Sequence, residues 1–351
     1  MLNIAFVIDK TQTLQIVWSL LLESISRGHN CHVFCNFDKS LVSEYGFIES
    51  VRWTFSPHKA KVISIATSEI HRYDVIFGIN LFNRSWRQLY ESGGEKCYSL
   101  EYCWNEMYNQ TKNMQCESTL LCNSRMSQQV ISDLSKYQNI DFLGSPWFEF
   151  LSLFEKKPVR NITVLSPHNS MLSHSSEIMP AFTGLLRNLR KWCDSNKYSL
   201  TLRTRKKYSH NVSGIVKFDN VVTDSLPFEH VQLYSSSAAV LHFCSSAINE
   251  LSFLRTPSIA LCNDVQKRLH ASTHHHAGIS RIHDAYYSAA AFDGIHYAGY
   301  PTKYIGGDET IITLENLISS EKSWKNFQQM LFPGNHCGSS ARILDMIEGK
   351  N

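Results

Sequence analysis

Residues 235–262 have the sequence SSSAAVLHFCSSAINELSFLRTPSIALC, and this stretch decides the fold. Apolar residues over Ala239–Phe243 predict a buried strand, and the small residues that follow predict a tight turn. The apolar spacing of Ala247–Leu254 predicts a helix, after which Pro257 opens a second buried strand, Ser258–Cys262. A strand, turn, helix and strand in this order form one repeat of a parallel α/β sheet.

The same alternation extends on both sides of this stretch within the second half of the chain. A buried strand is predicted at Asn161–Leu165 and a long amphipathic helix at Glu177–Cys193. The remaining predictions are strands at Ser199–Arg203 and Gly214–Phe218, a helix at Pro227–Ser235, and helices near Leu314–Met330 and Ser339–Glu348.

The first half of the chain has its own version of the pattern. Strand Asn3–Ile8 leads through a polar turn into a helix with apolar positions from Leu14 to Ile25, and Gly28 ends that helix before strand Cys31–Phe37. Further strands are predicted at Asp74–Ile79, Lys96–Glu101, Thr119–Cys122 and Ile140–Leu143, with a helix at Ser127–Leu134.

Two successive α/β patterns in 351 residues predict two Rossmann-like, doubly wound domains that face each other across a cleft, since one hydrophobic core rarely serves a chain of this length. We interpret Gly144-Ser145-Pro146 as a stop near the domain boundary. The expected domains are residues 1–150 and 158–335, and the helix within 336–351 could pack back across both.

The composition of the chain narrows the set of functions to consider. A net charge of +3 gives no bulk electrostatic reason to expect nucleic acid as a partner. Ten cysteines without a compact framework are typical of reduced thiols, and the start of the chain lacks the pattern of a signal peptide. The apolar runs are too short to span a bilayer, so we expect a cytoplasmic protein.

The turn after strand Ala239–Phe243 is the main candidate binding site. Ser245, Ser246 and Ala247 would present backbone N–H groups and hydroxyls at a helix start, which suits a phosphate or diphosphate. Glu250, one turn further on, could bind a sugar or ribose hydroxyl. The alternative for Glu250 is a capping role towards Ser246.

Three segments of the chain carry a resemblance to a known family. Residues 235–262 are similar to the donor-binding strand, turn and helix of GT-B glycosyltransferases, Phe142–Glu149 is similar to the motif that ends their first domain, and Gly338–Ile343 resembles their last helix. The likeness is strongest to bacterial surface-polysaccharide enzymes: CDP-glycerol glycerophosphotransferases, Kdo-type transferases and UDP-GlcNAc 2-epimerases. This sequence departs from their pattern at Cys244 and at Arg255-Thr256.

The resemblance implies a GT-B fold and a glycosyltransferase or phosphopolyol transferase that uses a nucleotide-activated donor in bacterial cell-surface polysaccharide synthesis. It implies a glycan or lipid-linked acceptor, leaves room for peripheral membrane association, and requires neither a cofactor nor a bound metal. The oligomeric state stays open. A UDP-sugar 2-epimerase and a non-catalytic protein that binds sugar nucleotides or glycans are the alternatives.

Further site candidates lie at the ends of other predicted strands. Arg205 and Lys207 follow strand Ser199–Arg203 and could bind the donor diphosphate, or they could belong to a solvated basic loop. For the base that takes the acceptor proton we consider Asp9 and Glu101, either of which could instead cap a helix. His168 could contact the donor phosphates or the leaving group, or it could be a surface histidine.

The triplet His274-His275-His276 does not predict a metal site. Adjacent side chains point in different directions, whereas zinc ligands converge on one ion at ~2 Å.

Overall fold

A computed structural model of the chain describes residues 1–8, 11–35, 61–64, 72–79, 96–101, 115–124, 128, 132, 136–167, 178–204, 212–223, 228–243, 247–261, 295–297, 307–319, 328 and 334–350. The chain forms two compact units. Unit 1 consists of Met1–Leu153, Ser225–Phe228 and Phe332–Asn351, and unit 2 consists of Phe154–Asp224 and Glu229–Leu331. Both units therefore combine segments that are distant in sequence.

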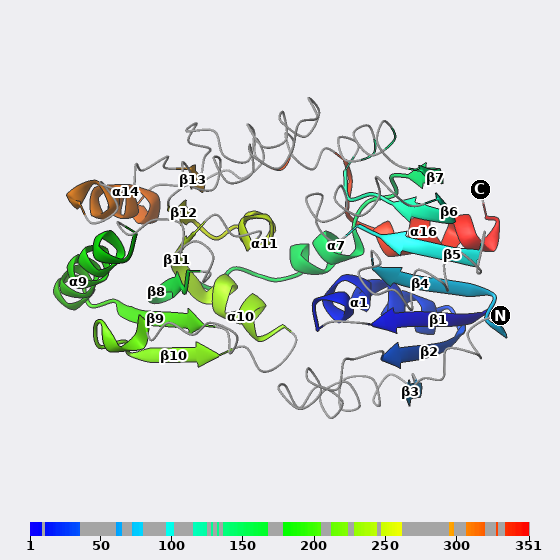
Figure 1. The fold of residues 1–351 in the computed structure, drawn as a ribbon, viewed down its shortest axis with the longest axis horizontal. Coiled ribbons are helices and arrows are strands. Elements are labelled where there is room, and N and C mark those ends of the chain that lie inside the picture. The colour runs from blue at the N-terminus through cyan, green and yellow to red at the C-terminus, as the bar shows by residue number, and fades with distance from the viewer. Residues whose placement is uncertain are drawn as a thin grey trace. The chain divides into compact units, whose positions relative to one another are not determined.

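Unit 1 contains a seven-stranded sheet in the order β3-β2-β1-β4-β5-β6-β7, with every neighbouring pair parallel (Figure 1). Its inner strand β1 is buried along almost its whole length, because parallel strands inside a sheet are covered on both faces. The strands are β1 Asn3–Ile8, β2 Asn30–Cys35, β3 Lys61–Ser64, β4 Val75–Ile79, β5 Cys97–Leu100, β6 Gln115–Leu121 and β7 Lys136–Asp141.

Helix α1, Thr11–Ser26, connects β1 to β2 and packs against two further helices of unit 1, α7 at Pro146–Ser152 and α16 at Ser339–Glu348. Helix α16 is also bonded to α7, since the Ser340 hydroxyl donates to the Glu149 carboxylate at 2.6 Å. The last helix of the chain is therefore part of the same unit as the first strand.

Unit 2 contains a six-stranded parallel sheet in the order β10-β9-β8-β11-β12-β13. The order repeats that of unit 1, since the first strand of each sheet lies inside it and the chain builds outwards first on one side and then on the other. The strands are β8 Val159–Leu165, β9 Ser199–Thr204, β10 Asn220–Thr223, β11 Ser237–His242, β12 Ser258–Ala260 and β13 Ile295–Tyr297. The helices are α9 Ile178–Asn196, α10 Glu229–Ser236, α11 Ala247–Phe253 and α14 Asp308–Ser319, with a 3₁₀ turn at Val212–Gly214.

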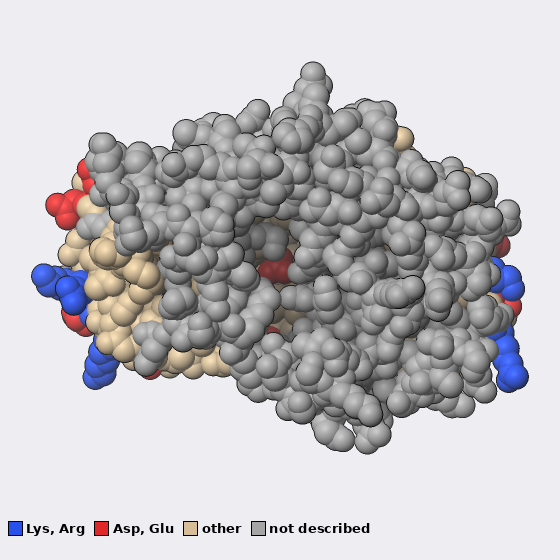
Figure 2. Space-filling model, in the orientation of Figure 1, with Lys and Arg blue, Asp and Glu red and all other residues tan. Residues whose placement is uncertain are grey.

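Charged side chains of the described residues form small mixed groups on the face drawn in Figure 2, where basic and acidic residues lie beside one another. Among the ion pairs of unit 2, the Arg190 guanidinium bonds both Asp194 and Asp219 at 2.7 Å.

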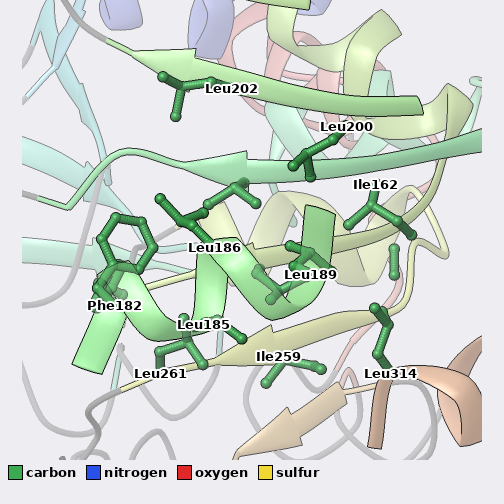
Figure 3. Close-up of a cluster of buried hydrophobic side chains, with 14 of the residues drawn as sticks. Ile162, Phe182, Leu185, Leu186, Leu189, Leu200, Leu202, Ile259, Leu261 and Leu314 are labelled. Atoms are coloured by element: carbon green, nitrogen blue, oxygen red, sulfur yellow. The ribbon is translucent and has the colours of Figure 1, made fainter. Parts of the chain in front are cut away.

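The core of unit 2 lies between α9 and one face of the sheet, with α14 beside it (Figure 3). Phe182, Leu185, Leu186 and Leu189 recur on one side of α9 at the spacing of helical turns and are fully buried. Figure 3 shows them directed at aliphatic side chains of β8, β9 and β12, which include Ile162, Leu200, Leu202 and Ile259.

The fold class predicted from the sequence is confirmed: two parallel, doubly wound α/β sheets of the GT-B-like kind. Several elements agree closely, with strand Asn3–Ile8 and helix Ser339–Glu348 at the predicted bounds. The helix predicted near Leu314–Met330 overlaps α14, which begins earlier and spans Asp308–Ser319, and most of residues 320–330 fall outside the described residues. Helix Ser127–Leu134 falls mostly outside the described residues.

The strand predicted at Gly214–Phe218 is wrong. Its apolar residues Ile215, Val216 and Phe218 pack against the core of unit 2 from the 3₁₀ turn and the chain that follows it. The strand begins later, at Asn220, after the Asp219 carboxylate has accepted the backbone N–H of Leu200 at 2.7 Å.

Strand β7 ends before Gly144-Ser145-Pro146, as the interpretation of these residues as a stop requires, and the same residues also start helix α7, which the sequence did not predict. Ser145 is the N-cap and its hydroxyl accepts the N–H of Phe148 at 3.4 Å, while Pro146 occupies the first helical position, where no N–H is needed. The preceding strand spans Lys136–Asp141 and not Ile140–Leu143.

Among the helices in the described parts of the chain, none is both long enough and apolar enough to cross a membrane.

Candidate functional site

The topology of unit 2 indicates where a ligand would bind. Strand β8 lies between β9 and β11, so the chain leaves it to one side first and returns to the other side later. In open parallel sheets, ligands bind outside the carboxyl ends of the strands at such a reversal point. Helices α10 and α11 follow strands β10 and β11, so both helices begin at this carboxyl edge, and they contact each other beside β11 (Figure 1).

His230 and Glu250 meet at this edge. His230 is the second residue of α10 and is buried, and Glu250 lies in the first turn of α11. The His230 Nε2 and the Glu250 Oε2 are 3.4 Å apart, and the side chain of Glu250 keeps 21% of its surface exposed. The carboxylate is therefore paired with His230 and still partly exposed to solvent.

Arg203 and Tyr234 extend this group along the same edge. Arg203 is the second-to-last residue of β9 and is 7% exposed. Its guanidinium donates to the Tyr234 hydroxyl and lies 5.0 Å from the centre of the Tyr234 ring. Because a guanidinium stays protonated in proteins, Arg203 places a permanent positive charge close to the carboxyl end of β9.

Tyr234 links the two halves of the group. Its ring contacts the His230 ring edge-on at 5.6 Å, and its carbonyl accepts the hydroxyl of the buried Thr256 at 2.9 Å. Arg203, Tyr234, His230 and Glu250 thus form a continuous chain of contacts from β9 to α11, which we call the edge cluster. This arrangement holds a cation and a carboxylate at the reversal point of the sheet.

His242, the last residue of β11, lies at the same edge but is fully buried. Burial lowers the pKa of His242 from 6.5 to about 3. The imidazole is therefore neutral at physiological pH and adds no charge to the edge cluster.

Most of the predicted donor-site residues adjoin this edge in sequence but lie outside the described residues. Arg205 and Lys207 follow the last residue of β9, Ser245 and Ser246 precede α11, and His168 follows Pro167 after β8. Ala247 is described, and as the first residue of α11 it shares that helix with Glu250.

Of the two candidates for the base in unit 1, Asp9 lies between β1 and α1 and is outside the described residues. Glu101 is described and is 2% exposed. It follows β5 and is bonded to Asn123, which follows β6. The backbone N–H of Asn123 donates to the Glu101 carboxylate at 2.5 Å, and the Asn123 side-chain amide donates to the Glu101 carbonyl at 2.9 Å. These two hydrogen bonds fix the orientation of the carboxylate. The pKa of the nearby Cys122 thiol is raised well above its usual value, first by burial and then by the charge of Glu101.

Sequence analysis did not single out His230 or Tyr234 as site residues. A spacing of four places both on one face of the helix predicted at Pro227–Ser235, and that spacing is the signal that could have found them. Arg203 begins the basic stretch 203–207 that was a candidate for the donor diphosphate, although Arg205 and Lys207 were favoured within it.

Across the residues that the structure describes, no group of three or more His, Cys, Asp or Glu side chains is arranged to hold a metal ion. The triplet His274–His276 lies outside those residues.

Comparison by sequence finds no matching family model and no matching curated protein. Comparison of structures finds matches along 99% of the chain. UDP-GlcNAc 2-epimerase from Methanocaldococcus jannaschii aligns over 99% of its own length with a TM-score of 0.61 and 10% identity. The epimerase from Neisseria meningitidis, bound to UDP-GlcNAc, aligns over its full 100% with a TM-score of 0.57 and 12% identity. The wall teichoic acid polymerase TagF aligns over 88% with a TM-score of 0.56 and 13% identity.

These matches, together with the two parallel sheets, define the class of the fold as GT-B-like. Within that class the chain has the architecture shared by UDP-GlcNAc 2-epimerases, TagF and the glycosyltransferase of kitacinnamycin.

Proposed function

We propose that this protein is a nucleotide-sugar-dependent glycosyltransferase, or a phosphopolyol transferase, of cell-surface polysaccharide synthesis. The observation that carries the proposal is the position of Glu250 in the first turn of α11, beside His230 and at the sheet edge where α/β proteins bind ligands. A carboxylate accepts hydrogen bonds from two adjacent hydroxyls of a ribose or sugar ring. Structures of the same fold hold UDP or UDP-GlcNAc, which supports a donor of this kind.

The donor diphosphate would bind next to Glu250. In this proposal Ser245, Ser246 and Ala247 contribute backbone N–H groups and hydroxyls, and Arg205 and Lys207 contribute charge. The guanidinium of Arg203 supports these groups from the end of β9, where Tyr234 fixes it. Positive charge held in place at the leaving phosphate stabilises the charge that develops there in the transition state.

The acceptor hydroxyl must lose a proton during transfer, and we assign Asp9 and Glu101 as candidates for the base. His168 is assigned to contact with the donor phosphates or the leaving group. Glu101 is favoured by its preset orientation, since the Asn123 backbone N–H holds one carboxylate oxygen at 2.5 Å.

The test is a thermal-shift screen of the purified chain against UDP-, CDP-, GDP- and CMP-linked donors, followed by titration calorimetry with the best donor. A donor at 100 times its Kd stabilises the folded state by about 2.7 kcal/mol. We expect Glu250→Gln to raise the Kd of that donor by about 10-fold or more, because a hydrogen bond to a charged group is lost.

The matched control is Glu309→Gln, which removes an exposed carboxylate from the first turn of another helix of unit 2, α14. The control should leave the Kd unchanged. The proposal would be contradicted if none of the donors stabilised the protein. It would also be contradicted if wild type and Glu250→Gln bound the best donor with the same Kd.

The full-length likeness to UDP-GlcNAc 2-epimerases favours one alternative, a UDP-sugar 2-epimerase-like activity. Incubation with donor alone separates the two, because an epimerase isomerises the donor without an acceptor. A mass increase of a glycan or lipid-linked acceptor identifies the transferase. Donor binding without either reaction identifies a non-catalytic binding protein.

A further inference from the structure

The two faces of the unit 2 sheet differ in character along β9. Leu200 and Leu202 belong to the apolar core beneath α9. Because successive side chains of a strand point to opposite faces, Thr201 and Arg203 point to the other face, which α10 covers. Arg203 is 7% exposed, so a permanently charged guanidinium lies buried under a helix at the carboxyl end of β9. Burial of a charge is costly unless other groups of the protein compensate it.

Tyr234 of α10 contacts this guanidinium in two ways. The Tyr234 hydroxyl accepts a hydrogen bond from the guanidinium, and the centre of the ring lies 5.0 Å from the guanidinium carbon. The hydrogen bond and the cation–π attraction both favour the charged side chain, and both are stronger where water is excluded. Two contacts from one side chain restrict the guanidinium to a narrow range of orientations.

The backbone around Tyr234 is itself fixed from two sides. Tyr234 is fully buried, and its carbonyl accepts the hydroxyl of the fully buried Thr256, which follows α11, at 2.9 Å. The Ser237 hydroxyl of β11 donates to the Leu233 carbonyl at 2.7 Å and is also bonded to the Thr163 hydroxyl of β8 at 2.8 Å. The end of α10 is therefore tied to the sheet and to the chain after α11. The ring that meets Arg203 extends from a rigid support.

We propose that Tyr234 is a positioning residue for phosphate binding: its hydroxyl and ring hold the Arg203 guanidinium at the carboxyl end of β9, where the positive charge attracts the phosphates of the donor. The inference rests on the proposed function and deepens it, because it assigns the charge that attracts the anion to a described pair within unit 2. A guanidinium that is already held in place loses less conformational entropy when an anion binds than a mobile one does.

A double-mutant cycle in urea unfolding tests the positioning without any donor. Tyr234→Phe keeps the ring and removes the hydroxyl, and Arg203→Lys keeps the charge and removes the planar fork. If the hydroxyl holds the guanidinium, the double variant should lose about 5-fold or more less of the folding equilibrium constant than the product of the two single losses. Losses that simply multiply would overturn the proposal.

Titration calorimetry with UDP and with uridine tests the consequence for binding, since a structure of the same fold holds UDP. Tyr234→Phe should raise the Kd for UDP by about 5-fold or more, because the charge near the phosphates is no longer held in place. The Kd for uridine, which has no phosphate, should change by less than about 2-fold. Damage to packing alone would weaken both ligands by the same factor.

The matched control is Tyr198→Phe in the same unit. Tyr198 also has an arginine over its ring, with the Arg160 guanidinium 6.0 Å from the ring centre, but its hydroxyl has no hydrogen bond among the residues that the structure describes. Tyr198→Phe should leave the Kd for UDP unchanged. The proposal is overturned if Tyr234→Phe binds UDP as tightly as wild type, if uridine is weakened by the same factor as UDP, or if the control has the same effect.

The two proposals fail separately. A wild-type protein that binds neither UDP nor any other nucleotide-linked donor contradicts the proposed function, and the double-mutant cycle still decides whether Tyr234 holds Arg203. Binding of UDP by wild type without loss in Tyr234→Phe contradicts the role of Tyr234 alone.

Discussion

The side chains of Arg27 and Glu348 meet at 2.9 Å although 321 residues separate them in the chain. Arg27 follows α1 and also bonds Asp345 at 2.7 Å and the Ala341 carbonyl at 3.2 Å, so one guanidinium contacts α16 at three positions. The neighbouring His29 accepts the N–H of Leu2 at Nδ1, which leaves Nε2 to donate to Glu348 at 2.7 Å. The last helix of unit 1 is thus held by residues at the start of the chain.

Replacing Arg27 should destabilise unit 1. The Arg27 side chain is 19% exposed, and Arg27→Ala leaves the 9% exposed Glu348 without one of its cationic partners. We expect a loss of about 1–3 kcal/mol, between the values for surface and buried pairs. Urea unfolding followed by the intrinsic tryptophan fluorescence of the chain measures it. Lys96→Ala, which removes an exposed cation of the same unit, should change stability by less than about 0.5 kcal/mol.

The contribution of Glu348 should depend on pH. Hydrogen bonds from Lys350, His29 and Arg27 lower the pKa of Glu348 from 4.5 to about 2. Because the folded-state pKa lies below the unfolded value, this stabilisation is present above about pH 4.5 and is lost as the pH falls towards 2. The stability difference between wild type and Glu348→Gln, measured by urea unfolding at several pH values, should shrink over that interval. A difference that stays constant down to pH 2 would contradict the assignment.

Gly144 should tolerate no side chain. Its φ is +91°, and a Cβ there would lie 2.9 Å from Arg342 Nη2, the Asn335 carbonyl and the Ser339 hydroxyl. Gly28 provides the matched control, since its φ is +79° and a Cβ would meet nothing within 4 Å. Gly28→Ala should cost about 1–2 kcal/mol from backbone strain alone, and Gly144→Ala should cost clearly more. Equal losses in thermal unfolding would show that the Gly144 turn can relax.

His242 should make unit 2 sensitive to mild acid. Its pKa is about 3 in the folded protein and 6.5 in the unfolded reference, so between these values the unfolded chain binds a proton that the folded chain does not. Stability should therefore fall as the pH decreases from 6.5 to 3, by up to about 1.4 kcal/mol per pH unit from this residue. His242→Gln should have a flatter profile in urea unfolding. Parallel profiles would mean that the buried imidazole takes up a proton without cost.

The elements that could be predicted from sequence are those with a long, clear apolar pattern. Strand Asn3–Ile8 is continuously buried from its second residue, helix α9 repeats buried apolar residues at helical spacing, and both were found. Strands β3 and β13, with four and three residues, are too short to show a period and were missed. The prediction of a strand at Gly214–Phe218 failed because apolar residues in an irregular turn can pack against the core just as residues of a strand do.

The candidate site was predictable to the level of a sheet edge. Brändén's rule led from the strand before Cys244 to Glu250, and the described structure places Glu250 at that edge. Its partner His230 is 20 residues away on another helix, and that contact depends on how α10 and α11 pack, which no local pattern encodes. The orientation of Glu101 likewise depends on Asn123, which follows a neighbouring strand.

The position of α16 has a consequence for synthesis of the protein. Unit 1 needs Phe332–Asn351 for completion, and at 5–20 residues per second the ribosome reaches Glu348 about 15–60 s after Arg27. During that interval the surface of α1 that α16 will cover is exposed on a nascent chain. The last segment of unit 2 ends at Leu331, before α16, so the half that starts first is finished last.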